Sequence, residues 1–187
     1  MHVLIQPLTP ATLPALLAIF EGDAFSDNPK WASCYCQCFH EDHRVVRWHE
    51  RTAAQNRALA IERGNAGTMR GHVAIVDCAV VGWCNAAPRA LLHALDEEPH
   101  DDVAATGCIV CFVVAPSLRG QGIAKALLEA ACAGLRDQGL KFVEANPRTG
   151  SVTAAQAHYG PLGMYLAAGF VVDRDSDDDS VWVRKPL

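Results

Sequence analysis

The stretch CIVCFVVAPSLRGQGIA, residues 108–124, decides the fold class of this chain. Its first seven residues are an uninterrupted apolar run, which is typical of a strand buried on both faces of a sheet. A loop with two glycines follows, and the apolar residues over 123–135 then recur at helical spacing. Residues 142–145 read as a further strand. Strand, loop, helix and strand together predict a βαβ unit with two parallel strands and a right-handed crossover.

The segments around this unit predict more helices and strands of the same domain, residues 1–187. Before it, we expect a strand over 2–8, a helix from Thr9-Pro10 to Phe20, a polar-faced helix over 44–63, and a hairpin of 72–76 with 79–86 that turns at Asp77-Cys78. After the hairpin, residues 89–105 read as a solvated acidic connection. After the βαβ unit, we expect a loop over 147–160, a short helix over 164–168, and a hairpin of 170–172 with 181–184 around an acidic turn over 173–179.

The composition is that of one globular domain. Of the 187 residues, 50% are apolar and 20% are charged, which excludes disordered and fibrous classes. The formal net charge of −5 gives no reason to expect a nucleic-acid partner. No signal peptide or membrane span is visible, so we expect a cytoplasmic protein whose eight cysteines are reduced thiols.

The loop after the apolar run carries the strongest chemical signal. Gly120 and Gly122 allow a ligand to approach the backbone, and the next helix points its positive dipole end at the loop. Arg119 adds a guanidinium suited to phosphate oxygens. The Walker pattern does not occur in the chain, and Lys125 stands where the dinucleotide fingerprint needs a third glycine. A pyrophosphate site and a plain connecting turn remain the two interpretations of the residues alone.

The loop resembles the acetyl-CoA signature of the GNAT N-acetyltransferases. Residues 119–124 fit its pattern of Arg or Gln, two residues, Gly, one residue, and Gly or Ala. Tyr165-Leu-Ala-Ala-Gly-Phe170 is similar to the family's Tyr-x-x-x-Gly-Phe. The expected order of elements is also the GNAT order, so the resemblance covers most of the chain. It implies an α/β fold with a central mixed sheet, splayed parallel strands and flanking helices.

The resemblance also implies a site for acetyl-CoA. The pantetheine arm would pair with the central strand at 112–114, the pyrophosphate would lie on 119–124, and the amide region of Val113 or Val114 would polarise the thioester carbonyl. His158 occupies the position of a family asparagine that contacts CoA. The expected CoA-binding residues are Phe112, Val113, Val114, Arg119, Gly120, Gln121, Gly122, Ile123, Ala124 and His158.

Acetyl transfer to an amine needs a base for the attacking nitrogen and an acid for the leaving thiolate. The resemblance implies that Tyr165 protonates the CoA sulfur, and a buried tyrosine that only packs the short helix is the alternative. Glu144, near the end of its strand, is the candidate base if burial raises its pKa, and a merely solvated glutamate is the alternative. His158 is the second candidate for the base.

The segment after the first helix is rich in cysteines and aromatics. Cys34, Cys36, Cys38 and His40 recur at every second residue and could suit zinc, but the spacing lacks the gap of zinc knuckles. We therefore expect no metal. Instead, Trp31, Tyr35, Cys36 and Phe39 are expected to pack over the acceptor mouth. The run Gly82-Trp83-Cys84 resembles a GNAT subgroup, so that Trp31, Tyr35 and Trp83 are the expected acceptor contacts.

The function expected from these observations is acetyl transfer from acetyl-CoA to a primary amine by direct attack in a ternary complex. The acceptor would be a small-molecule or peptide amine, with no nucleic acid or membrane involved. A covalent route through Cys108 or Cys111 is the minor alternative, because a thiol buried in an apolar strand reacts poorly. A non-catalytic acyl-CoA sensor and a zinc-binding module over 34–43 are the competing functions. The acceptor, the acyl length and a homodimeric state stay open.

Overall fold

A computed structural model describes residues 2–98, 100–150, 156–176 and 179–187. They form a seven-stranded sheet with the order β1-β2-β3-β4-β5-β7-β6. All neighbouring strands are antiparallel except β4 and β5, which are parallel, so the expected mixed sheet is confirmed. The strands are β1 Leu4–Pro7, β2 Gly71–Val76, β3 Ala79–Pro88, β4 Thr106–Val114, β5 Phe142–Ala145, β6 Val171–Ser176 and β7 Ser180–Pro186.

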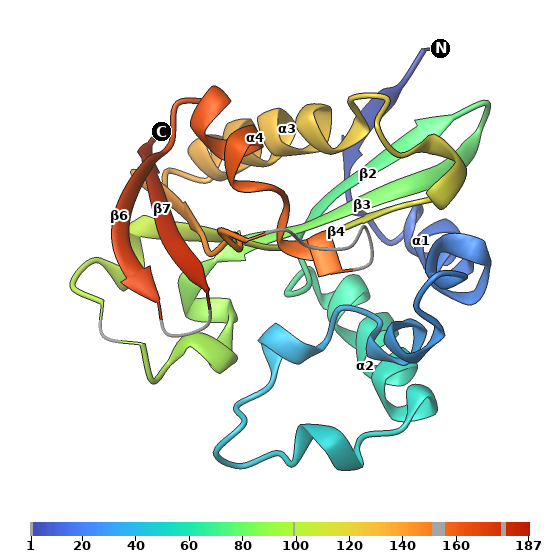
Figure 1. Cartoon of the computed structure of the whole chain (residues 1–187). Helices are drawn as coiled ribbons and strands as arrows, with labels where there is room; N and C mark the ends of the chain where they lie inside the picture. Colours follow the sequence, from blue (N-terminus) through green and yellow to red (C-terminus); the bar gives the residue numbers. More distant parts are fainter. Residues whose placement is uncertain (1, 99, 151–155, 177–178) are drawn as a thin grey trace.

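Helices cover both faces of the sheet (Figure 1). α3 and α4 lie on one face, and α1 and α2 lie on the other. α3 buries the predicted apolar stripe against the sheet, including Leu127, Leu128 and Leu135. Among the described residues, none of the helices combines the length and apolar character that crossing a bilayer requires. The helices are α1 Leu13–Glu21, α2 Ala53–Ala66, α3 Ile123–Asp137 and α4 Leu162–Ala167.

The predicted hairpin and central strand are both present. Asp77 and Cys78 have φ of 48° and 65°, as a tight turn between β2 and β3 requires. β4 occupies the middle of the sheet, and most of its residues are buried. Asn85 pairs with Cys111 and Ala86 pairs with Ile109, so Val110 is an extra residue in β4. This β-bulge changes which side chains face each side of the sheet.

The parallel pairing of β4 and β5 is short. It joins only Thr106–Ile109 to Phe142–Ala145, whereas β4 continues to Val114. Within the described part of the chain, no strand pairs with this edge of β4 beyond Ile109. The backbone groups on that edge are therefore available to a ligand, as the resemblance implies.

Both predicted helix starts on the N-terminal side were wrong. α1 begins at Leu13, after a turn over 10–12 in which the amides of Thr12 and Leu13 both donate to the Thr9 carbonyl. α2 begins at Ala53 and not at residue 44. Thr52 and Gln55 form a capping box there: the Gln55 amide donates to the Thr52 hydroxyl (3.2 Å), and the Thr52 amide donates to the Gln55 side chain (2.9 Å). Such a cap fixes a helix start more strongly than the absence of Pro and Gly does.

The connection over 89–105 is not simply solvated, which corrects the prediction. Its side chains Leu92 and Leu95 pack with Val110 and Trp182 in a third buried cluster. The Arg89 side chain is only 2% exposed and donates to the carbonyls of Leu95 and Glu98, at 3.2 Å each. The acidic residues predicted a surface loop, but a buried arginine fastens the connection to the sheet.

The C-terminal elements follow the predicted order with shifted limits. β6 extends to Ser176, so most of the expected acidic turn is strand, and Asp177 and Asp178 lie outside the described residues. The short helix α4 begins two residues earlier than expected. In the expected loop over 147–160, Gln156–Tyr159 form a 3-10 turn, and residues 151–155 lie outside the described part.

Candidate active site

A cavity of about 390 Å³ lies where β4 ends and α3 begins. We call it the loop cavity. Its other walls come from the segment over 24–31 after α1 and from the 3-10 turn before α4. Nine of the ten expected CoA-binding residues line it, namely Phe112, Val113, Val114, Arg119, Gly120, Gly122, Ile123, Ala124 and His158. Gln121 is exposed beside the cavity and donates to the Ser117 carbonyl at 3.2 Å.

The two glycines of the loop hold its backbone open. Gly120 and Gly122 have φ of 74° and 84°, in the left-handed region that favours glycine. A Cβ at either position would meet no described atom within 4 Å, so the space in front of the backbone is free. Gly122 is also the N-cap of α3, whose dipole end therefore faces the cavity. This geometry suits an anionic group such as a phosphate.

Arg119 is engaged by the protein itself. Its guanidinium forms an ion pair with Asp27 and donates to the carbonyls of Val114 (3.0 Å) and Ala24 (3.3 Å). The hydrogen bond from Arg119 lowers the pKa of Asp27 below its usual value. Arg119 thus fastens the segment after α1 to the end of β4. The contact between Arg119 and a phosphate stays a prediction.

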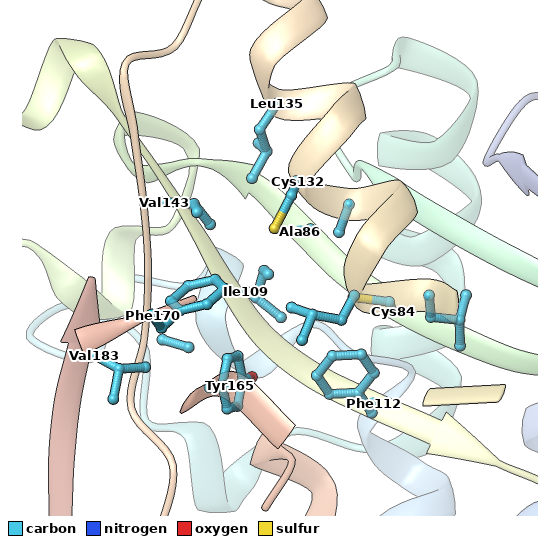
Figure 2. Packing of buried hydrophobic residues seen from close by; sticks show 14 of the residues in the cluster. Cys84, Ala86, Ile109, Phe112, Cys132, Leu135, Val143, Tyr165, Phe170 and Val183 are labelled. Atoms are coloured by element: carbon cyan, nitrogen blue, oxygen red, sulfur yellow. The ribbon is translucent and has the colours of Figure 1, made fainter. Parts of the chain in front are cut away.

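Tyr165 lies inside the core between α4 and the sheet. Figure 2 shows its ring among Phe112, Phe170 and Val183, and the side chain is 0% exposed. Its hydroxyl donates to the Tyr159 carbonyl at 2.7 Å. Burial raises the pKa of Tyr165 well above its ordinary value, so the hydroxyl keeps its proton. The hydroxyl therefore holds the 3-10 turn beside the loop cavity, and a role as acid stays a prediction.

Glu144 does not line the loop cavity, and its expected place near the acceptor stays a prediction. Its carboxylate is 0% exposed and contacts His100 and Arg184, at 2.9 Å each. Arg174 and Arg89 lie at 3.4 Å and 3.7 Å. Partners from the 89–105 connection and from β6 and β7 therefore enclose this carboxylate. The surroundings are those of a buried structural ion cluster, and they do not support a general base.

A second cavity of about 170 Å³ lies beside β4 at the point where its pairing with β5 ends. We call it the aromatic cavity, because its apolar walls include Phe39, Tyr159 and Trp182. Ile109 and Val110 of β4 complete these walls. Its polar lining is formed by Glu98, Asn146, Arg148, Ser176 and Ser180.

The 3-10 turn Gln156–Tyr159 separates the two cavities. His158 lines the loop cavity and Tyr159 lines the aromatic cavity, with their ring centroids 4.0 Å apart. Burial raises the pKa of Tyr159 to about 12, so its hydroxyl stays protonated at neutral pH. Except for Phe39, the sequence prediction missed the lining of the aromatic cavity, since its residues come from segments far apart in the chain.

Of the three expected acceptor contacts, only Trp31 lines a cavity, and that is the loop cavity. Its ring packs edge-on against His158, with centroids 4.3 Å apart. Tyr35 is buried against Phe20, and Trp83 is 0% exposed in the core between α1 and the sheet. Both rings pack in the apolar core, and their contact with an acceptor stays a prediction.

The cysteine-rich segment is folded back on itself and not extended. Tyr35 and Cys36 have φ of 46° and 55° and stand between two 3-10 turns. All eight cysteines are free thiols, and burial raises the pKa of Cys34 and Cys38 to about 12. The described residues contain no group of three or more His, Cys, Asp or Glu side chains arranged to hold a metal ion.

The sequence profile of the Acetyltransferase (GNAT) family matches residues 28–164, which is more than half of the chain. The matched region includes the loop over 119–124 and the free edge of β4. It also includes the 3-10 turn that lies between the two cavities. The chain therefore belongs to the GNAT acetyltransferase family.

Solved structures show the same fold. PaiA N-acetyltransferase from Thermoplasma acidophilum in complex with coenzyme A has 15% identity, a TM-score of 0.60 and 100% coverage of both chains. The ribosomal-protein-alanine N-acetyltransferase from Brucella melitensis has 21% identity and a TM-score of 0.59, with 98% of this chain and 99% of that chain covered. YncA from Salmonella typhimurium with its cofactor acetyl-CoA has 16% identity and a TM-score of 0.58, with 99% and 94% covered. No curated protein shows significant sequence similarity to the chain.

Proposed function

We propose that the protein transfers an acetyl group from acetyl-CoA to a primary amine by direct attack within a ternary complex. The observation that carries this proposal is the placement of two cavities along one strand. Phe112–Val114 line the loop cavity, and Ile109 with Val110 line the aromatic cavity just before them in β4. A donor in one cavity and an acceptor in the other would meet at the free edge of β4.

The loop cavity fits the donor. Its apolar side chains Phe112, Val114 and Ile123 suit a pantetheine arm, whose amides would pair with the free edge of β4. The open space over Gly120 and Gly122, at the start of α3, suits a pyrophosphate. Acetyl-CoA supplies an activated thioester, and a backbone amide of Val113 or Val114 would stabilise the oxyanion that forms at its carbonyl.

The alternative mechanism, a covalent acetyl-enzyme, would need Cys108 or Cys111 as the nucleophile. Cys108 is buried, and burial raises its pKa to about 12, so it is not a thiolate at neutral pH. Cys111 lies close to Cys36, and its interaction with that thiol is the largest cause that raises the pKa of Cys36. Direct attack of the amine needs neither thiol. Tyr165, whose hydroxyl is held at the dividing turn, is the proposed proton donor to the leaving thiolate.

Initial rates measured with both substrates varied would test this proposal. A ternary complex gives intersecting double-reciprocal lines, whereas a covalent route gives parallel lines and a protein that gains one acetyl mass on incubation with acetyl-CoA alone. Calorimetric binding of acetyl-CoA without turnover on a broad panel of amines would instead indicate a non-catalytic acyl-CoA sensor. Either of the last two results would overturn the proposal.

A further inference from the structure

The floor of the aromatic cavity is an extension of the sheet. After β5, the Pro147 carbonyl accepts from the Val181 amide at 3.1 Å, and Arg148 is bridged to Ser180. Residues opposite each other in such a pairing, and residues two apart along each strand, face the same side. Asn146 and Arg148 therefore face the cavity together with Ser180 and Trp182. Backbone pairing with Ser180 therefore holds Arg148 at the cavity.

The cavity has the size of one ring. An apolar cavity of about 150 Å³ is enough to hold benzene, and this one measures about 170 Å³. Tyr159 packs edge-on to Phe39, with ring centroids 6.2 Å apart, so two of its walls form one aromatic corner. Such walls favour a flat or branched apolar group over a long flexible chain.

The cavity also carries one charge of each sign. Glu98 and Arg148 both line it, and neither forms an ion pair with any residue that the structure describes. This differs from Arg89, Arg174 and Arg184, which all contact Glu144. A charged side chain without a partner at a cavity wall is available to a ligand of opposite charge.

The Asn146 side chain adds a polar contact beside Arg148. Its Nδ2 atom is buried and has no hydrogen-bond partner among the described residues. Buried donors are nearly always satisfied in native proteins, so this amide points to a ligand acceptor group or a water. Asn146 and Arg148 together present two donors on one face of the extended segment, as a carboxylate requires.

We infer that the acceptor is a free α-amino acid whose side chain is about the size of one ring, held in the aromatic cavity between Glu98 and Arg148. This inference rests on the proposed acetyl transfer and names the acceptor for it. The ring would lie against Phe39 and Tyr159, the carboxylate would bind Arg148 and Asn146, and Glu98 would attract the ammonium group. The ammonium group first loses one proton to solvent, and the neutral amine attacks the thioester carbon. The C–N bond forms, the C–S bond breaks, the nitrogen loses its second proton, and the thiolate takes up a proton and leaves as CoA.

The test compares L-phenylalanine with phenethylamine, which has the same ring and amine but no carboxylate. We expect the wild-type protein to acetylate L-phenylalanine with the lower KM. Arg148→Gln should raise that KM by roughly ten- to a hundredfold, since it removes a charge-assisted hydrogen bond. The KM for phenethylamine should stay within about twofold. Arg136→Gln, an exposed arginine near the end of α3, is the matched control and should change neither value.

Calorimetric titration of L-phenylalanine into the CoA-saturated protein gives a second readout that needs no turnover. Absence of binding, or equal binding to the wild-type protein and Arg148→Gln, would overturn the inference. So would equal KM values for the two amines, or a preference for a peptide that begins with phenylalanine. If phenethylamine is acetylated and L-phenylalanine is not, the proposed acetyl transfer is supported and the inference of an amino-acid acceptor is refuted. If L-phenylalanine binds in a way that depends on Arg148 but no amine is acetylated, the amino-acid site is supported and the proposed acetyl transfer is refuted.

Discussion

Glu144 shows how the surroundings of a single residue decide its role. Its carboxylate compensates Arg89, which is 2% exposed, and also contacts Arg184 and His100. Glu144→Gln keeps the shape but leaves a buried guanidinium without its counter-charge. We expect the free energy of unfolding to fall by about 3–5 kcal/mol in urea titrations.

Glu129→Gln is the control for that substitution. Glu129 is exposed on α3 and lies 3.9 Å from Lys125, so its loss should cost less than about 1 kcal/mol. A Glu144→Gln protein with wild-type stability, but with a turnover deficit that shrinks as pH rises, would contradict the structural role. That result would restore the glutamate as a general base.

Tyr165 can be tested by removing one oxygen atom. Tyr165→Phe keeps the ring against Phe112 and Phe170 and deletes the hydroxyl that donates to the Tyr159 carbonyl. We expect turnover to fall by roughly one to three decades if the hydroxyl protonates the leaving thiolate. CoA affinity should change little, and stability should fall by about 1 kcal/mol.

Tyr35→Phe provides the comparison for the tyrosine experiment. The Tyr35 hydroxyl contacts Glu21 at 3.4 Å, and the residue lines neither cavity. Its removal should leave turnover unchanged. If Tyr165→Phe also turns over like the wild-type protein, the Tyr165 hydroxyl serves only to hold the 3-10 turn.

The loop at the start of α3 depends on glycine for two separable reasons. Gly122→Val forces a branched residue to a φ of 84° and also fills space in front of the loop. Gly139→Val, beyond the other end of α3 at a φ of 82° and equally open, imposes the same strain away from both cavities. We expect similar losses of stability from the two substitutions. Calorimetry should show weakened CoA binding for Gly122→Val alone, and equal affinities would refute the phosphate-loop assignment.

The cysteine-rich segment is joined to the 89–105 connection through His40. Its Nδ1 lies 3.1 Å from the Leu91 carbonyl and its Nε2 lies 3.4 Å from the Asn85 amide nitrogen, which fits a neutral ring that donates at Nδ1 and accepts at Nε2. Burial lowers the pKa of His40 to about 4. The unfolded chain, with an ordinary histidine pKa near ~6.5, takes up the proton first as pH falls.

This difference predicts a loss of stability in acid. The contribution of His40 is fully present above pH ~6.5 and is lost as pH falls toward about 4. At pH 5 the loss should be about 2 kcal/mol relative to pH 7. His40→Asn is expected to unfold more easily at pH 7 but to lose less stability between pH 7 and 5. Parallel pH profiles of the two proteins would show that His40 is not the titrating group.

Across the whole molecule, predictions succeeded where the information is local. The apolar run before Arg119 and the helical spacing after Gly122 lie within one βαβ unit, so the central strand, α3 and the glycine loop between them could be derived from neighbouring residues. The start of α2 was missed although Thr52-x-x-Gln55 is a readable capping signal. The error arose because the predicted helix was extended over all residues from 44 to 63, since none of them is Pro or Gly.

The aromatic cavity could not be predicted, because sheet register brings its parts together. Phe39, Glu98, Tyr159 and Trp182 belong to four segments that meet only once β5 and β7 are paired. The burial of Glu144 was hidden for the same reason, since Arg89 and Arg184 lie 55 and 40 positions away. Long-range pairing of charges leaves no periodic pattern in a sequence.

The short pairing between β4 and β5 has a consequence for the order in which the chain matures. Strands β1 to β4 form one contiguous half of the sheet, and all of their residues emerge from the ribosome before β5 does. That half can assemble during synthesis and leave one edge of β4 unpaired, whereas β5 pairs on its far side with β7, which is synthesised later. Glu144 gains its Arg184 partner only at that last step. The pairing of β5 with β7 and the burial of the Glu144 carboxylate are therefore one late event. We expect nascent chains that stop before residue 184 to be degraded by proteases more readily than the full chain.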